Sequence, residues 1–99
     1  MTYRVIFAPA ADAQLIELFH YLADVAGTET AHQYIDHVLG QCETLSQFPV
    51  RGVQRDDLMS GLRVTHYKRT AILFTIVDQS VLILGLYHGG QDYDTRFLQ

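Results

Sequence analysis

Apolar residues follow a helical period in the first half of the chain and a strand-like pattern in the second half. From Pro9 to Gly27, apolar positions recur at spacings of three and four residues, which predicts an amphipathic helix. The same spacing returns from Thr28 or Thr30 and stops by Pro49, so a second helix is expected to form an αα-hairpin with the first. Each helix has one apolar stripe and therefore covers a neighbouring layer on one side only.

Four segments rich in β-branched and aromatic residues are predicted to form strands. These segments are Tyr3–Ala8, Leu62–His66, Lys68–Val77 and Val81–His88. The short link Asp78–Ser80 predicts an antiparallel hairpin between the last two. The order β-α-α-β-β-β predicts an α+β domain, with the helical hairpin packed on one face of a small, largely antiparallel four-stranded sheet.

Both faces of the predicted sheet are apolar. Strict alternation puts Ile72, Phe74 and Ile76 opposite Ala71, Leu73 and Val77, and puts Val81, Ile83 and Tyr87 opposite Leu82, Leu84 and Leu86. The two helices can cover only one face, and the segment 93–99 is short for the other. A loop, the C-terminal tail, a second copy or a partner must cover the rest, and a binding partner is the leading interpretation.

Length, charge and cysteine content exclude several classes of protein. The 99 residues predict a single domain spanning residues 1–99. The net charge of −4 argues against bare nucleic acid as the main partner, because such partners are held by a strongly basic face. The one cysteine allows no internal disulfide and favours the reducing cytoplasm. We expect no signal peptide and no membrane helix, which needs about 18 consecutive apolar residues.

The basic residues are concentrated in one stretch, where five of the seven Lys and Arg occur with two aspartates. The five are Arg51, Arg55, Arg63, Lys68 and Arg69. This stretch carries a net +3 (5 minus 2) and leaves −7 (2 minus 9) for the remainder. The pattern predicts a local anion-attracting patch, and the alternative is ordinary solvated charge that protects a sheet edge.

The histidines and the cysteine predict no metal centre and no cofactor. His20, His32 and His37 lack the i, i+4 pairing of a helical zinc site, and no cysteine cluster accompanies them. Cys42 falls on the apolar stripe of the second helix and is expected to be a small core residue.

His66 and His88 end predicted strands near three tyrosines, Tyr67, Tyr87 and Tyr93. A histidine titrates near neutral pH, so either could act as a general acid or base. The alternative is a strand-terminal histidine that hydrogen-bonds backbone. The dipeptide 89–90 lacks the spacing of a phosphate loop and is interpreted as a turn.

Four segments stand in a distinctive order: YRVIFAPAADAQL at the start, LSQFPVRG at the end of the second helix, GLR at Gly61–Arg63, and VLILGLYHGGQDY at the close. In this order and spacing, from Tyr3 to about Tyr93, the chain resembles the RelE/ParE toxin superfamily, and within it the ParE-like toxins of type II toxin–antitoxin systems. The resemblance implies the same β-α-α-β-β-β fold.

The resemblance implies one of two activities. RelE-like members are ribosome-dependent mRNA endonucleases that use Lys and Arg together with a Tyr or His, which here correspond to Arg63, His88 and Tyr93. ParE-like members inhibit DNA gyrase by binding and have no catalytic residue. No cation follows His88 until Arg96, and the chain is acidic, so a gyrase inhibitor is favoured over an RNase. An attenuated member that keeps only antitoxin binding is a third possibility.

The resemblance also implies a ParD-like antitoxin as partner, with DNA contacted only indirectly through that antitoxin. A wrapping antitoxin tail with apolar anchors and carboxylates would suit the apolar sheet face and the basic stretch. The residues predicted to bind partners are Arg51, Arg55, Arg63, Tyr67, Lys68, Arg69, Tyr87 and His88.

Overall fold

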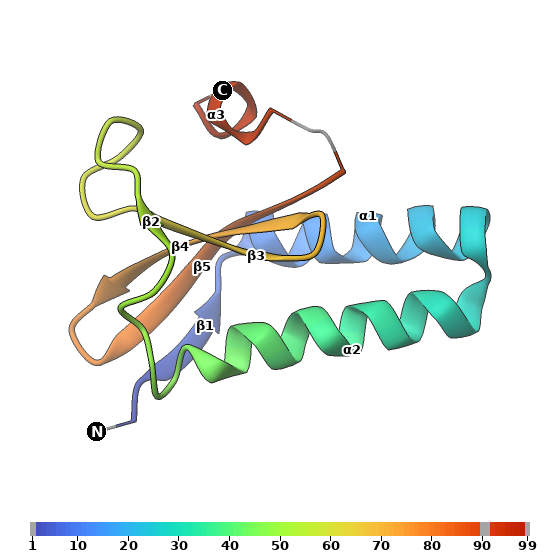
Figure 1. Ribbon diagram of the computed structural model, residues 1–99, viewed down its shortest axis with the longest axis horizontal. Coiled ribbons are helices and arrows are strands. Elements are labelled where there is room, and N and C mark those ends of the chain that lie inside the picture. The colour runs from blue at the N-terminus through green and yellow to red at the C-terminus, as the bar shows by residue number, and fades with distance from the viewer. Residues whose placement is uncertain (1, 90–91, 99) are drawn as a thin grey trace.

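A helical hairpin lies against a five-stranded sheet in the computed structural model, which describes residues 2–89 and 92–98 (Figure 1). The elements in chain order are β1 (Arg4–Phe7), α1 (Pro9–Ala26), α2 (Thr28–Thr44), β2 (Val53–Gln54), β3 (Arg63–Tyr67), β4 (Thr70–Val77), β5 (Ser80–His88) and α3 (Tyr93–Phe97). The α+β class and the helical hairpin predicted from the sequence are confirmed. No helix among the described residues is long and apolar enough to cross a membrane.

Proline and glycine set the limits of the hairpin helices. Pro9 lies in the first turn of α1, where its missing N–H leaves no bond unmade. Gly27 alone connects α1 to α2 with φ 95°, and its carbonyl accepts from Ala31 N–H at 3.0 Å. Glycine reaches this φ without strain, so the second helix can start at once. α2 ends at Thr44, before Pro49, because the next backbone bonds tighten to i→i−3 spacing.

The sheet has the strand order β1-β5-β4-β3-β2, in which β1 runs parallel to β5 and the other neighbours are antiparallel. The prediction of four strands was therefore one short. β2 pairs Val53 with Val64 and Gln54 with Arg63, and two residues are too few to show an alternating period. The predicted hairpin between β4 and β5 is confirmed.

A β-bulge reverses the orientation of the last residues of β5. The pairing with β4 passes over Leu84, so the strict alternation expected along β5 was wrong beyond that point. Leu86 packs in the cluster under the helices, and Tyr87 packs on the other face. Gln14 of α1 supports the bulge, because its Oε1 accepts from the Leu86 N–H at 2.7 Å.

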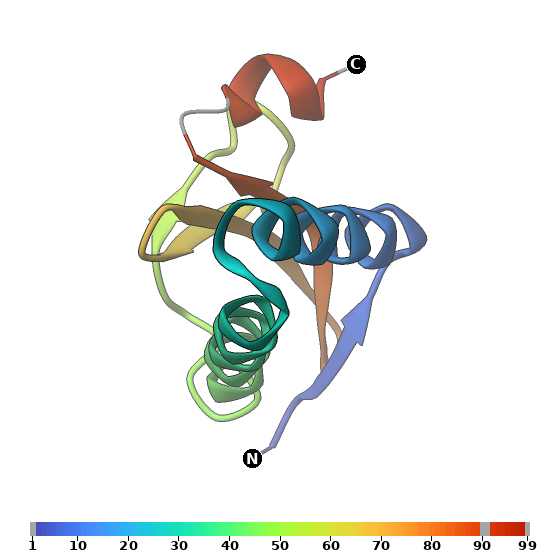
Figure 2. The ribbon, with the colours of Figure 1, turned by 90° about the vertical axis from the view of Figure 1, so that its right-hand side faces the viewer.

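Two apolar clusters occupy the two faces of the sheet. The cluster under the helical hairpin consists of Ala11, Val38, Cys42, Leu45, Ile72, Phe74, Val81, Ile83 and Leu86. The cluster on the other face, called the second cluster below, consists of Leu62, Val64, Ala71, Leu73 and Tyr87. Figure 2 shows α3 on the opposite side of the sheet from α2.

The second cluster is covered by the chain itself. Leu58 and Met59 from the loop before β3, and Tyr93 and Phe97 from α3, pack against it. Tyr93 and Phe97 are four residues apart, so they project from the same side of this short helix. The expectation that the C-terminal segment is too short to cover this face was therefore wrong for the second cluster.

Candidate functional site

The basic residues between positions 51 and 69 lie in three places. Arg51 and Arg63 lie together, because Arg63 Nη1 donates to the Arg51 carbonyl at 3.2 Å. Lys68 and Arg69 form the turn between β3 and β4. At ~3.3 Å per strand residue, Lys68 lies about 16 Å along the sheet from Arg63. Arg55 lies in the loop before β3 and contacts α3. The single basic patch expected from the sequence is thus spread over both ends of β3.

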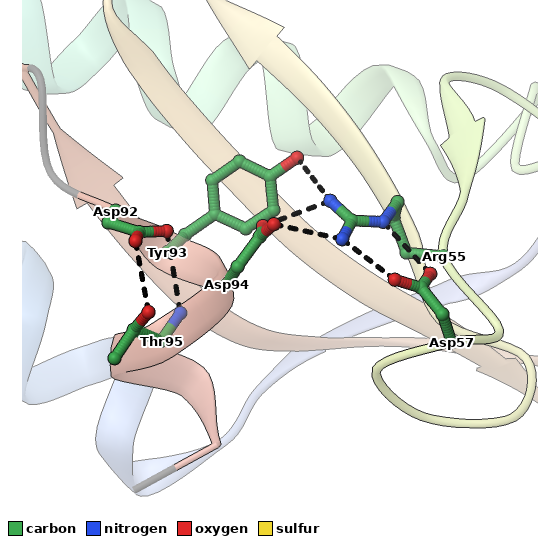
Figure 3. Close-up of polar contacts among 6 residues, drawn as sticks. All are labelled: Arg55, Asp57, Asp92, Tyr93, Asp94 and Thr95. Carbon is green, nitrogen blue, oxygen red and sulfur yellow. Dashed lines mark hydrogen bonds and ion pairs between the residues drawn. The ribbon is translucent and has the colours of Figure 1, made fainter.

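Arg55 uses all five of its guanidinium N–H groups within the chain (Figure 3). Its Nε and Nη2 donate to the two carboxylate oxygens of Asp57 at 3.0 and 2.9 Å. Its Nη1 and Nη2 donate to Asp94 at 2.9 and 3.0 Å, and Nη1 also donates to the Tyr93 hydroxyl at 3.0 Å. An arginine has five donors, so in this arrangement Arg55 has none left for a partner.

The same contacts stabilise the charged forms of the groups around Arg55. Hydrogen bonds to Asp57 and then to Asp94 raise the pKa of Arg55 above its ordinary value. The hydrogen bond from Arg55 lowers the pKa of Asp57. Asp92 begins α3 by accepting from Thr95 N–H at 3.4 Å and from its hydroxyl at 2.9 Å (Figure 3). Arg55 therefore fastens α3 to the loop before β3.

A hydrogen-bonded cluster lies under the helices where β3, β4 and β5 meet. It consists of Tyr34, Tyr67, Thr70 and His88, and is called the Thr70 cluster below. Thr70 is fully buried, and its Oγ1 lies 2.8 Å from His88 Nδ1 and 2.7 Å from the Tyr34 hydroxyl. The Tyr34 hydroxyl also donates to the Tyr67 carbonyl at 3.3 Å, and the Tyr34 ring packs edge-on against the His88 ring. These contacts fix the orientation of the His88 imidazole.

The surroundings of the His88 imidazole disfavour its protonated form. Burial first, and then the positive charge of Arg69, lower the pKa of His88 below its ordinary 6.5. A neutral imidazole held in one orientation can accept a proton, as a general base requires. Acid–base chemistry at His88 stays a prediction, and the structure adds the contacts that orient the ring.

Thr70→Val is expected to lower the free energy of unfolding by about 1–2 kcal/mol, because the variant keeps the shape but loses the hydroxyl that Tyr34 and His88 share. The matched control is Thr65→Val on β3, whose hydroxyl has no side-chain hydrogen bond among the described residues. That control is expected to leave stability unchanged. Urea denaturation of both variants checks the difference, and equal stabilities would contradict a structural role for the shared hydroxyl.

The three residues of the RNase alternative do not meet at one point. Arg63 is paired with Phe74 of β4, and His88 is paired with Thr70 of the same strand. Phe74 and Thr70 are four residues apart, so the backbones of Arg63 and His88 are separated by about 13 Å along β4. Tyr93 packs on the second cluster, on the opposite face of the sheet from the Thr70 cluster. The assignment of a nuclease role to these residues remains untested.

The remaining predicted residues differ in how much surface they offer. Tyr87 is only 7% exposed and packs within the second cluster. Tyr67 is half-buried, and its hydroxyl lies 3.1 Å from His37 Nδ1. His66 is exposed on the other face, with its ring centroid 6.5 Å from that of Tyr93. Of the two tyrosines predicted to bind a partner, Tyr87 is the less accessible.

Cys42 is a core residue, as the sequence predicts. It is 1% exposed within the cluster under the helices, and burial first, then the nearby charge of Glu43, raise the pKa of its thiol to about 12. A thiol with this pKa is not a nucleophile at neutral pH. Among residues 2–89 and 92–98, no three His, Cys, Asp or Glu side chains are grouped closely enough to hold a metal ion.

The sequence of the chain matches one protein family over most of its length. The family described as ParE toxin of type II toxin-antitoxin system, parDE, matches residues 5–93. The chain belongs to this ParE toxin family. The match covers every element from β1 to the start of α3 except the first residue of β1. No curated protein matches this ParE-family chain by sequence.

Solved structures share the fold of this ParE-family chain. One is a chain of the chromosomal ParDE TA system from P. aeruginosa, with a TM-score of 0.77, 18% identity, and coverage of 88% of this chain and 96% of that chain. Another belongs to the toxin–antitoxin complex RelBE2 from Mycobacterium tuberculosis, with a TM-score of 0.68, 21% identity, and coverage of 92% and 95%. Both likenesses concern the fold.

Proposed function

We propose that this ParE-family toxin inhibits DNA gyrase by binding, acts in the cytoplasm as one domain spanning residues 1–99, and uses neither a catalytic residue nor a cofactor. The observation that carries the choice of gyrase over RNA is the separation of Arg63, His88 and Tyr93 within a ParE-family chain. Phosphoryl transfer needs cations and an acid–base group around one scissile bond. The net charge of −4 further disfavours docking on ribosomal RNA.

The RNase alternative rests on one feature, the oriented imidazole of His88 with its lowered pKa. Inducing the toxin in growing cells separates the possibilities. Gyrase inhibition predicts growth arrest with relaxed plasmid DNA and intact transcripts. Transcripts cleaved at ribosomal A-sites would support the RNase reading, and normal growth with supercoiled plasmid would support an attenuated, antitoxin-binding relic.

A ParD-like antitoxin is the proposed neutralising partner, and DNA would be contacted only through it. Phe48, Val50 and Val53 are 59%, 73% and 65% exposed, and they flank Arg51, whose guanidinium lies over the Phe48 ring at 5.6 Å. Arg63 adjoins the same segment. We call residues 48–53 with Arg63 the Phe48 surface. Apolar side chains beside two cations complement an antitoxin tail with apolar anchors and carboxylates.

Replacing both Val50 and Val53 by aspartate is expected to weaken antitoxin binding at least about tenfold. The change removes two apolar contacts and places two negative charges opposite the carboxylates of the antitoxin tail. The matched control is Val77→Asp at the end of β4, where the valine is 50% exposed but lies outside the Phe48 surface. Titration calorimetry measures the affinity of the double variant and of the control variant for the cognate antitoxin. Equal affinities for the wild type and the double variant would exclude this surface, and circular dichroism verifies that each variant is folded.

A further inference from the structure

A pocket of about 440 Å³ lies between α1 and the C-terminal end of β5. One wall is formed by Gln14, Glu17 and Tyr21, which follow one another at spacings of three and four along α1. The other wall carries Arg69, His88 and Arg96, from the turn before β4, the end of β5 and α3. We call this the α1–β5 pocket. Its volume lies in the range of ~300–1,000 Å³ that is typical of small-molecule sites.

The two arginines of the α1–β5 pocket differ from Arg55. Neither Arg69 nor Arg96 has an ion pair or a side-chain hydrogen bond among the described residues, whereas Arg55 has every donor in use. Two guanidinium groups on one cavity repel each other, and an anion between them removes that repulsion. The planar fork of donors in arginine matches the oxygens of a phosphate group.

The position of each arginine is set by the fold. The backbone carbonyl of Arg69 accepts from Gly89 N–H at 2.9 Å, and a Cβ on Gly89 would lie 3.9 Å from Arg69 Nη2. The guanidinium therefore lies beside the end of β5. Arg96 is carried by α3, which Arg55 fastens through Asp94. The cationic side of the pocket thus depends on the anchor of α3.

The wall formed by α1 adds two further features. Tyr21 lines the pocket and is 55% exposed, with its ring centroid 6.1 Å from that of His88. An exposed aromatic ring can stack on a nucleic-acid base. Glu17 is the only carboxylate that lines the pocket among the described residues. It can accept hydrogen bonds from hydroxyl or amino groups of a ligand, and it disfavours ligands with several negative charges.

We propose that the α1–β5 pocket binds a nucleoside monophosphate. The phosphate lies between Arg69 and Arg96, the base stacks on Tyr21, and Glu17 accepts from a sugar hydroxyl or a base amino group. A lone carboxylate side chain of a protein partner would fill little of this volume and would leave the Tyr21 face unused. The proposal does not depend on whether the toxin acts on gyrase.

The test is titration calorimetry of the full chain with adenosine 5′-monophosphate and guanosine 5′-monophosphate, alongside adenosine and inorganic phosphate. At least one monophosphate is expected to bind saturably and more tightly than either fragment. Arg69→Ala and Arg96→Ala should each weaken that binding about tenfold or more, because each removes a charged hydrogen-bonding group. Arg4→Ala, which changes an exposed arginine of β1 outside both the pocket and the Phe48 surface, is the matched control and should leave affinity unchanged.

Three outcomes would overturn the proposal. They are the absence of saturable binding by both monophosphates, equal affinity for inorganic phosphate alone, and equal affinities of the Arg69, Arg96 and Arg4 variants. Glu17→Gln supplies a second readout, because removing the carboxylate should improve binding of adenosine triphosphate relative to the monophosphate. An unchanged ratio would contradict the role of Glu17. Circular dichroism establishes that the variants, all at the protein surface, remain folded.

Discussion

Gly52→Ala is expected to lower the midpoint of thermal unfolding by about 12 °C or more. The expected loss in the free energy of unfolding is roughly 3 kcal/mol, and each kcal/mol shifts the midpoint of a domain of this size by about 4–8 °C. Gly52 has φ 73°, which an alanine adopts only with strain. A Cβ at this position would also overlap the backbone carbonyl oxygen of Val64 and lie 2.8 Å from its carbon. Val64 pairs with Val53 on β2 and with Leu73 on β4, so it cannot move aside without disturbing both ladders.

Gly40→Ala is the matched control for this prediction. Gly40 lies within α2, and a Cβ there would meet nothing within 4 Å. Alanine at such a position is expected to stabilise the helix by up to about 1 kcal/mol. Thermal denaturation followed by circular dichroism compares the two variants. A Gly52 variant as stable as the wild type would contradict the close approach of this loop to β3.

Arg55→Met is expected to detach α3 from the loop before β3. The substitution keeps an apolar stem but removes all five donors, so Asp57 and Asp94 lose their partner and Tyr93 loses the bond to its hydroxyl. Hydrogen exchange measured by mass spectrometry should be several-fold faster in residues 93–97, with α1 and α2 unchanged. Arg51→Met is the control, because the Arg51 guanidinium contacts Thr44 and Phe48 rather than α3 among the described residues. Unchanged protection of α3 would contradict the anchor.

The same variant should alter the dependence of stability on pH. Arg55 lowers the pKa of Asp57 below its ordinary 3.8 in the folded chain, so the folded state binds this proton less readily than the unfolded state. The stabilisation is therefore fully present above about pH 3.8 and is lost as the pH falls through the lowered folded pKa. Urea midpoints measured from pH 6 to pH 2 should fall less steeply in the variant. Parallel curves would exclude this ion pair as a source of acid sensitivity.

The sequence predicted the helical hairpin well, because its signals are local. Pro9 and Gly27 mark the limits of α1 within the chain itself, and the apolar spacing continues without a break between them. β2 was missed, because Val53 and Gln54 become a strand only through pairing with β3. The bulge was missed for the same reason. A regular two-residue turn between β4 and β5 would pair Thr70 with Tyr87, whereas the structure pairs Thr70 with His88.

The candidate site was harder to predict, because its contacts join distant parts of the chain. The bond between Arg55 and Asp94 spans 39 positions, and no local pattern marks it. Arg55 was predicted as a partner-binding cation for that reason, and Asp94 was not singled out. The bond from Tyr34 to Thr70 spans 36 positions and was likewise missed. The sequence offered one signal for the pair of Arg55 and Asp94, namely the opposite charges of the last helix and the basic loop.

A DNA supercoiling assay with purified gyrase tests whether the toxin inhibits this enzyme. The toxin is added to gyrase, relaxed plasmid and ATP, with and without prior mixing with its antitoxin. Gyrase inhibition predicts loss of supercoiling as the toxin approaches saturation, and recovery when the antitoxin is mixed in first. Full supercoiling at saturating concentrations of folded toxin would contradict it.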